Sequence, residues 1–90
     1  MLAEKQITVL GATGSIGQSA LALVRENHGK FSVQALVAGE NYQALAALAS
    51  EFQPKIIGIH DESKFSDLCN LVSDLDCDVV AGKQACTEIA

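Results

Sequence analysis

One stretch decides the fold: Ile7-Thr8-Val9-Leu10-Gly11-Ala12-Thr13-Gly14-Ser15-Ile16-Gly17. It reads as a short apolar strand, a glycine-rich turn and the first turn of a helix. Gly11 lets the chain leave the strand sharply, Gly14 lets the backbone approach a phosphate, and Gly17 lets the helix lie close to the strand. The free N–H groups and the positive end of the helix dipole then face any anion above the turn, where Thr13 and Ser15 add hydroxyls. The stretch predicts a site for a dinucleotide pyrophosphate.

The glycine spacing is G-x-x-G-x-x-G, which differs from the commoner G-x-G-x-x-G of dinucleotide-binding proteins. A glycine pattern by itself is weak evidence, and the alternative is a tight strand-to-helix turn without a ligand. The context favours nucleotide binding, because a strand precedes the glycines, a helix follows them, and they open a chain of alternating strands and helices.

The rest of the chain repeats the strand-helix alternation at intervals of about 25 residues, which is typical of right-handed βαβ units and a parallel sheet. Strands are expected at 6–10, 31–37, 55–59 and 78–81. The first helix is expected over 15–27, and the fourth begins near Lys83. The second helix follows an N-cap at Asn41, and the third follows a cap at Asp61 or Ser63. We therefore expect an α/β fold with a Rossmann-like, doubly wound parallel sheet that is incomplete. The first three strands are expected in the spatial order 3-2-1, and local sequence leaves the fourth beside either the first or the third.

Apolar side chains at helical spacing predict which face of each helix covers the sheet. The expected stripes are Ile16, Ala20, Leu23 and Val24 in the first helix, Leu45, Leu48, Ala49 and Phe52 in the second, and Phe65, Leu68, Cys69 and Val72 in the third. Gly29 suits the left-handed exit from the first helix.

Composition bounds the kind of protein. With 49% hydrophobic and 19% charged residues, 90 residues form at most one small domain with a core. The net charge of −5 argues against a nucleic-acid or anionic membrane surface. No apolar run approaches the roughly 20 residues that span a bilayer, and the first six residues lack the apolar core of a signal peptide, so we expect a cytoplasmic protein.

The cysteines and histidines do not form a site. Cys69 and Cys86 are expected to face the core, and Cys77 lies in a loop between acids. No cysteine pair has metal-ligand spacing, and neither His28 nor His60 has a partner at such spacing. We therefore assign no metal site and no catalytic residue within this chain.

The loop after the second strand, Ala38-Gly39-Glu40-Asn41, is the second place where a ligand is expected. In this fold that loop reaches the adenosine ribose, and NAD-binding proteins usually carry an acid at the tip of the strand. Here that tip has no carboxylate, and Glu40 follows in the loop. Its alternative role is that of a solvated carboxylate in the first turn of the next helix. Gly39 fits close backbone approach, and Asn41 can cap the helix and still contact a ligand.

At this point the chain resembles a specific family, 1-deoxy-D-xylulose 5-phosphate reductoisomerase. The resemblance rests on the glycine stretch of 7–17, on Phe31-Ser32-Val33-Gln34-Ala35-Leu36-Val37-Ala38-Gly39-Glu40-Asn41, and on Ala81-Gly82-Lys83-Gln84-Ala85. It spans essentially the whole chain, which then corresponds to the N-terminal part of an NADP-binding domain, residues 1–90. The family's strand beside the first one comes later in the chain, which favours the strand order 4-3-2-1.

The resemblance implies an NADPH-dependent enzyme of the non-mevalonate route to isoprenoids, which converts 1-deoxy-D-xylulose 5-phosphate to 2-C-methyl-D-erythritol 4-phosphate. By position, Thr13, Gly14, Ser15 and Ile16 line the pyrophosphate and neighbouring ribose, and Gly39, Glu40 and Asn41 surround the adenosine ribose and its 2′-phosphate. The divalent metal (Mg or Mn), the catalytic residues and the phosphorylated sugar belong to later parts of the family's chain, and the full-length enzyme is expected to be a homodimer. The 90-residue chain alone is expected to be inactive.

Position 40 is often basic in that family, and a carboxylate beside a phosphate is repulsive. We therefore expect weaker discrimination between NADPH and NADH than in relatives with a cation there. The sequence leaves two alternatives to the reductoisomerase open. One is the NADP-binding domain of a semialdehyde or acyl-phosphate dehydrogenase, for which the three cysteines are badly placed. The other is a non-catalytic dinucleotide-sensing module.

Overall fold

A computed structural model describes residues 5–27 and 29–89 of the chain. The elements run in the order β1 (Lys5–Leu10), α1 (Ser15–Glu26), β2 (Phe31–Ala38), α2 (Tyr42–Phe52), β3 (Ile56–Ile59), the 3-10 turn η1 (Glu62–Lys64), α3 (Phe65–Leu71), β4 (Asp78–Ala81) and α4 (Lys83–Ile89). Each predicted strand is present, with bounds that differ from the expected ones by one residue or none. His28, for which we predicted no chemistry, lies outside the described residues.

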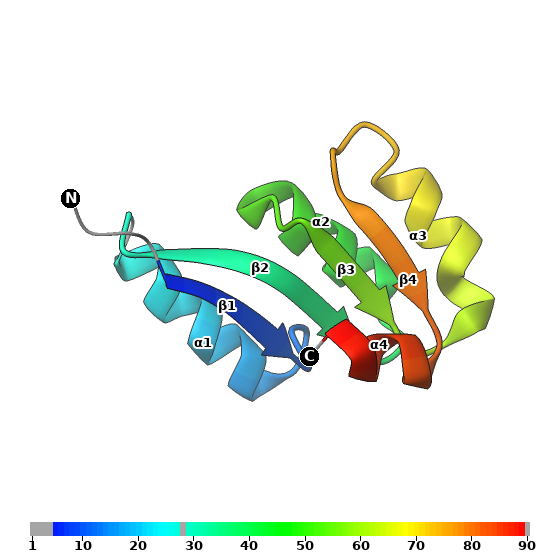
Figure 1. Ribbon diagram of the computed structural model, residues 1–90, viewed down its shortest axis with the longest axis horizontal. Coiled ribbons are helices and arrows are strands. Elements are labelled where there is room, and N and C mark those ends of the chain that lie inside the picture. The colour runs from blue at the N-terminus through cyan, green and yellow to red at the C-terminus, as the bar shows by residue number, and fades with distance from the viewer. Residues whose placement is uncertain (1–4, 28, 90) are drawn as a thin grey trace.

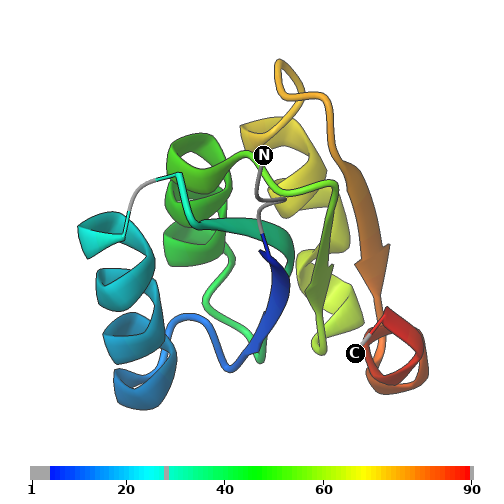
Figure 2. The ribbon, with the colours of Figure 1, turned by 60° about the vertical axis from the view of Figure 1, so that its left-hand side comes forward.

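The four strands form one parallel sheet in the order β1-β2-β3-β4, which confirms the predicted order 4-3-2-1 and the α/β class. Helices α1, α2 and α3 lie together on one face of this sheet, whereas α4 lies apart at the carboxyl ends of β3 and β4 (Figures 1 and 2). Right-handed crossovers between successive neighbouring strands put all three connecting helices on the same face. All strands therefore end at one edge, from which the loops that can hold a ligand project.

The core lies between the sheet and α1, α2 and α3. β2 and β3 are the most buried strands, because each has a strand on either side and helices above it. Buried apolar side chains from both layers make up the core: Val9, Ala12, Leu21, Val24, Val33, Leu36, Ala38, Leu45, Ala46, Leu48, Ala49, Ile57, Ile59, Leu68 and Val72. None of the described helices is long and apolar enough to span a membrane.

The predicted buried face of α1 is partly wrong. Gly17, Leu21 and Val24 face the sheet, while Ile16 is 85% exposed and Leu23 is 59% exposed. The contact of Gly17 with the end of β1 fixes how the helix is rotated, and Leu21 and Val24 follow it at i+4 and i+7. The expected stripe lay beside this one, and Ile16 is left at the surface of the strand-to-helix turn.

The other stripes agree better with the structure. In α2, Leu45, Leu48 and Ala49 are buried and Phe52 is partly buried, as predicted. In the third stripe, Leu68 and Val72 are buried and Cys69 is half-buried, but Phe65 is 40% exposed. Phe65 directly follows η1, where the chain has just turned into the helix, so it lies at the rim of the core.

The helix ends agree with the sequence predictions at Asn41 and Gly29 but not at the start of α3. The Asn41 side chain accepts a hydrogen bond from the amide of Ala44 at 3.1 Å, which confirms it as the N-cap of α2. The prediction that Asp61 or Ser63 caps the third helix is wrong for α3, whose N-cap is Lys64 without a side-chain cap hydrogen bond. Asp61 instead caps the preceding η1 turn, which the sequence did not predict, by accepting from the amide of Ser63 at 3.0 Å. Gly29 has a φ of +90°, the left-handed conformation expected after α1.

Candidate dinucleotide-binding site

The turn after β1 is a corner built almost entirely from backbone. Gly11 has a φ of +62°, and its carbonyl oxygen accepts from the amide of Gly14 at 2.9 Å. The amide of Ala12 donates to the carbonyl of Val37 at 2.8 Å, which ties the corner to the end of β2. A Cβ atom on Gly17 would lie 2.2 Å from the Gly11 oxygen, so glycine is required for this close approach of helix and strand. The predicted roles of Gly11 and Gly17 are confirmed.

The first turn of α1 has no side-chain cap. Its N-cap is Gly14, which has no side chain to accept from the helix. Within the described part of the chain, the amides of Ser15, Ile16 and Gly17 have no hydrogen-bond acceptor. Uncapped first-turn amides and the positive end of the helix dipole form a ready site for an anion. This turn therefore offers donors where the sequence predicts a pyrophosphate.

A cavity of about 270 Å³ lies at the carboxyl ends of β1, β2 and β3, beside this corner. We call it the carboxyl-edge cavity, and its lining residues are Leu10, Gly11, Val37, Ala38, Gly39, His60, Cys86 and Thr87. Its lining is mainly apolar, and α4 closes one side of it through Cys86 and Thr87. Leu10, at its rim, is 57% exposed. Ligands of open α/β sheets bind in this position, outside the carboxyl ends of the strands.

The loop after β2 is held in place by the loop after β3. The amide of His60 donates to the carbonyl of Ala38, and the amide of Asp61 donates to that of Gly39, each at 3.0 Å. The carbonyl of Glu40 accepts from the amide of Tyr42 at 2.9 Å. The backbone of this loop is thus fixed, and the side chain of Glu40 is exposed.

The structure brings the predicted site residues together at one edge of the sheet. Thr13, Gly14, Ser15 and Ile16 lie in the corner and the first turn of α1, and Gly39, Glu40 and Asn41 lie in the loop after the adjacent strand. All are exposed except Thr13, which is half-buried. Whether they contact a cofactor stays a prediction.

Sequence reasoning missed part of the cavity lining. His60 was given no role and Thr87 was not considered, yet both line the carboxyl-edge cavity. His60 directly follows β3, so its place at this edge could have been expected once β3 was placed. Thr87 comes there because α4 turns back over the sheet, where Cys86 packs above Gly58, and no local pattern signals that path.

The cysteine at the carboxyl-edge cavity is not activated as a nucleophile. Burial raises the pKa of the Cys86 thiol, which therefore stays protonated at neutral pH. Asp61 behaves differently, because hydrogen bonds from the hydroxyl and the amide of Ser63 lower the pKa of its carboxyl group. Among residues 5–27 and 29–89, no group of three or more His, Cys, Asp and Glu side chains is arranged to hold a metal ion.

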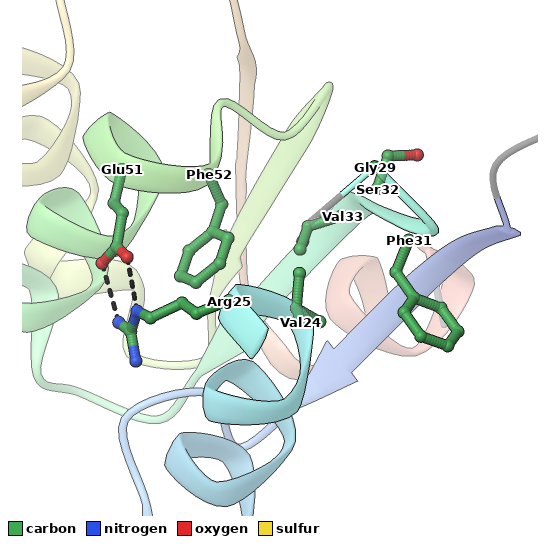
Figure 3. Close-up of a pocket in the computed structure, with 8 residues that line it drawn as sticks. All are labelled: Val24, Arg25, Gly29, Phe31, Ser32, Val33, Glu51 and Phe52. Carbon is green, nitrogen blue, oxygen red and sulfur yellow. Dashed lines mark hydrogen bonds and ion pairs between the residues drawn. The ribbon is translucent and has the colours of Figure 1, made fainter. Parts of the chain in front are cut away.

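A larger cavity, of about 560 Å³, lies at the opposite end of β2, between the last turns of α1 and α2 (Figure 3). We call it the amino-edge cavity, and it is lined by Val24, Arg25, Gly29, Phe31, Ser32, Val33, Glu51 and Phe52. Arg25 forms an ion pair with Glu51, and its guanidinium carbon lies 5.0 Å from the centre of the Phe52 ring. The charged groups of this cavity are thus already paired with each other.

The parallel sheet, the glycine corner with its uncapped helix and the cavity beside it define a Rossmann-like α/β protein of the dinucleotide-binding class. Comparison with known proteins identifies the family. The family model of 1-deoxy-D-xylulose 5-phosphate reductoisomerase matches residues 7–90. The chain belongs to the 1-deoxy-D-xylulose 5-phosphate reductoisomerase family.

Relatives with that name are similar over nearly the whole chain. The protein from Microcystis aeruginosa is 42% identical over 88 residues, which are 96% of this chain and 23% of the relative. The one from Desulfitobacterium hafniense strain Y51 is 45% identical over 80 residues, 89% of this chain and 21% of the relative. The chain therefore spans less than a quarter of the length of these relatives.

Solved structures agree with the fold. The reductoisomerase from Zymomonas mobilis in complex with NADPH has a TM-score of 0.92 at 37% identity, over 96% of this chain and 23% of that one. A DOX-P reductoisomerase in complex with NADPH, fosmidomycin and magnesium has a TM-score of 0.89 at 34% identity, over 94% of this chain and 21% of that one. The family match also decides against the semialdehyde or acyl-phosphate dehydrogenase alternative.

Proposed function

We propose that this chain is the cofactor-binding segment of an enzyme that converts 1-deoxy-D-xylulose 5-phosphate to 2-C-methyl-D-erythritol 4-phosphate with NADPH, in the non-mevalonate route to isoprenoids. The family membership and the solved relative in complex with NADPH support this function. The observation within this chain that carries it is the uncapped first turn of α1 beside the glycine corner, where the amides of Ser15, Ile16 and Gly17 have no acceptor within the described residues.

The residues present fit this cofactor. The first-turn amides of α1 would donate hydrogen bonds to the pyrophosphate, and the hydroxyls of Thr13 and Ser15 would lie next to it. The backbone of Gly39 would allow the ribose to approach the second loop closely, because among residues 5–27 and 29–89 no atom apart from those of Gly39 and its chain neighbours lies within 4 Å of the position of a Cβ there. The side-chain oxygen of Asn41 is used by the helix cap, so its amide nitrogen is left to donate to the cofactor.

When bound, NADPH supplies the hydride, and the chain's own residues bind and orient it. Ile16, exposed at the rim of the corner, would cover the pyrophosphate and its neighbouring ribose and would exclude water from them. We propose that a divalent metal and the acid-base residues are supplied by segments outside this chain, in agreement with the magnesium in relatives' structures. The chain alone is then inactive and binds NADPH weakly.

The test uses the complete product of the gene that contains this sequence. Incubation with 1-deoxy-D-xylulose 5-phosphate, NADPH and magnesium is expected to oxidise NADPH, and removal of the metal with a chelator is expected to stop the reaction. Titration of NADPH into the 90-residue chain is expected to give an affinity weaker than micromolar. Tight NADPH binding by the complete protein without turnover of the sugar phosphate would instead indicate the dinucleotide-sensing alternative.

Two further proposals come with the family. The complete protein is expected to be a homodimer, which sedimentation of the purified protein tests. It is also expected in the cytoplasm, which fractionation of cells that express the complete gene tests.

A further inference from the structure

A third cavity, of about 480 Å³, adjoins the loop after β2. We call it the charged cavity, and it is lined by Gly39, Glu40, His60, Asp61 and Lys83. Three segments that are separate in sequence supply these residues: the loop after β2, the loop after β3, and the first residue of α4. It shares Gly39 and His60 with the carboxyl-edge cavity, so the two hollows are neighbours.

Of the charged side chains that line the charged cavity, Asp61 has hydrogen-bond partners and Lys83 has no ion-pair partner among the described residues. Asp61 is occupied, because its Oδ1 accepts from the amide of Ser63 at 3.0 Å and from the hydroxyl of Ser63 at 2.6 Å. Within the described residues Arg25–Glu51 is the one ion pair, so Lys83 is paired with neither Glu40 nor Asp61. Glu62 lies against Gly82 but does not line this cavity. The ammonium group of Lys83, an exposed residue, is therefore available to a ligand.

A nearby cation would stabilise a phosphate at this loop. The chain has a net charge of −5, and Glu40 stands in the loop where the adenosine ribose is expected, so both oppose a 2′-phosphate. Among the described residues that line the charged cavity, Lys83 alone carries a permanent positive charge. His60 lies in the same cavity and adds ring nitrogens that can hydrogen-bond to a phosphate oxygen.

We propose that Lys83 binds the 2′-phosphate of NADPH and thereby determines the preference of this protein for NADPH over NADH. This inference rests on the proposed function and assigns the role to a residue more than forty positions beyond the loop, on α4. Glu40 acts against Lys83 at the same site, so the preference depends on the balance of the two charges. Replacement of either residue shifts that preference, in opposite directions.

The experiment measures the dissociation constants of NADPH and NADH with the complete gene product and its Lys83→Gln variant. We expect Lys83→Gln to weaken NADPH binding about tenfold and NADH binding less than about twofold, as for loss of one hydrogen bond to a charged group. Lys83→Arg keeps the charge and is expected to retain the preference. Glu40→Lys is expected to raise it.

Lys55→Gln is the matched control. Lys55 is also an exposed lysine, but it stands just before β3 at the opposite edge of the sheet, where its amide bonds to the carbonyl of Gln34. The variant removes the same charge and is expected to leave both dissociation constants unchanged. A second probe pair, 2′,5′-ADP and 5′-AMP, differs only in the 2′-phosphate. Lys83→Gln is therefore expected to weaken the binding of 2′,5′-ADP and to leave the binding of 5′-AMP unchanged.

The outcomes separate this inference from the proposed function. If NADPH binds to the unaltered protein, and Lys83→Gln changes the affinities for NADPH and NADH equally or changes neither, the role of Lys83 is overturned and the proposed function stands. A loss of equal size in Lys55→Gln also overturns it, because the effect is then one of net charge. If the unaltered protein binds neither cofactor, the proposed function fails and this inference fails with it.

Discussion

The two ends of β2 carry cavities of opposite character. The amino-edge cavity is the larger, about 560 Å³ against about 270 Å³ for the carboxyl-edge cavity. In the amino-edge cavity, however, Arg25 and Glu51 bond to each other, and Phe52 covers the guanidinium (Figure 3). Beside the carboxyl-edge cavity, the first-turn amides of α1 lack acceptors within the described residues.

The size of a cavity therefore says less about ligand binding than whether its polar groups already have hydrogen-bond partners. A polar group that already has a partner gains little from a ligand, because each new hydrogen bond replaces an existing one. An amide without a protein partner gives up only a hydrogen bond to water when it binds a ligand. We therefore propose that the smaller cavity is the binding site and that the larger one is a gap between two helix ends, and the variants below test that assignment.

The largest effect is expected for Gly17→Val at the carboxyl edge. A Cβ there would lie 2.2 Å from the oxygen of Gly11 and 2.7 Å from Cα of Ala12, so α1 must move away from the sheet. We expect a loss of about 3 kcal/mol in the free energy of unfolding, measured by urea denaturation, together with loss of NADPH binding. Ala22→Val, on an exposed position of the same helix, is the control and is expected to cost about 0.5 kcal/mol through helix propensity.

The next effect is on binding, in Gly14→Asp. A carboxylate at this N-cap accepts hydrogen bonds from the first-turn amides and repels a phosphate. The polar groups of the site are then already paired within the protein, as they are in the amino-edge cavity. We expect NADPH affinity to fall about a hundredfold, or about 2.7 kcal/mol, in calorimetric titration. Gly14→Asn adds a side chain of the same size and capping ability without the charge, and it is expected to lose clearly less NADPH affinity than Gly14→Asp. Equal losses in both variants would show that the added side chain acts by its bulk alone, near the oxygen of Gly11.

A smaller effect is expected for Asn41→Ala, in the second loop of the site. The variant removes the hydrogen bond from the amide of Ala44 and should cost about 1 kcal/mol of stability. Asn41→Ser keeps a capping oxygen but lacks the amide nitrogen that we propose for the cofactor. It is therefore expected to keep near-normal unfolding in urea while NADPH binding weakens. Normal NADPH binding in Asn41→Ser would limit Asn41 to capping.

Most of the fold could be predicted from the sequence, because strand-helix alternation and glycine spacing are local signals. The order of the first three strands, the Asn41 cap and the close approach at Gly17 follow from such signals, whereas the place of the fourth strand was predicted from the family resemblance alone. The buried face of α1 was wrong because apolar residues stand on more than one side of that helix. Leu23 and Ile16 fit a helical stripe as well as Leu21 does, and only the contact at Gly17 decides between them.

The candidate site was predictable in its loops and less so in its surroundings. Parallel strands end at one edge, so the loops after β1 and β2 had to be neighbours once those strands were paired. The placement of Lys83 and Thr87 depends on how α4 packs, where Cys86 lies over Gly58 at the far strands. Such packing is a long-range contact, and no periodicity within a few residues encodes it.

The smallest effect is expected at the amino edge, in Glu51→Gln. The hydrogen bond from Arg25, with its charge, lowers the pKa of the Glu51 carboxyl. A carboxyl group whose pKa is lower in the folded state stabilises the fold above its unfolded pKa, and this contribution disappears as the pH falls through the folded pKa. The stability difference between the unaltered protein and Glu51→Gln should therefore be present at neutral pH and vanish in acid. Thermal unfolding across that pH range measures it.

The size of that difference should stay below that of Asn41→Ala, because both partners of the ion pair are exposed and solvent screens them. Asp61, whose pKa is lowered as well, titrates in both proteins and cancels from the comparison. NADPH affinity should be the same in both, since the pair lies at the far end of β2 from the glycine corner. A loss of NADPH affinity in Glu51→Gln as large as that of Gly14→Asp would reverse the assignment, because it would make the larger cavity part of the binding site.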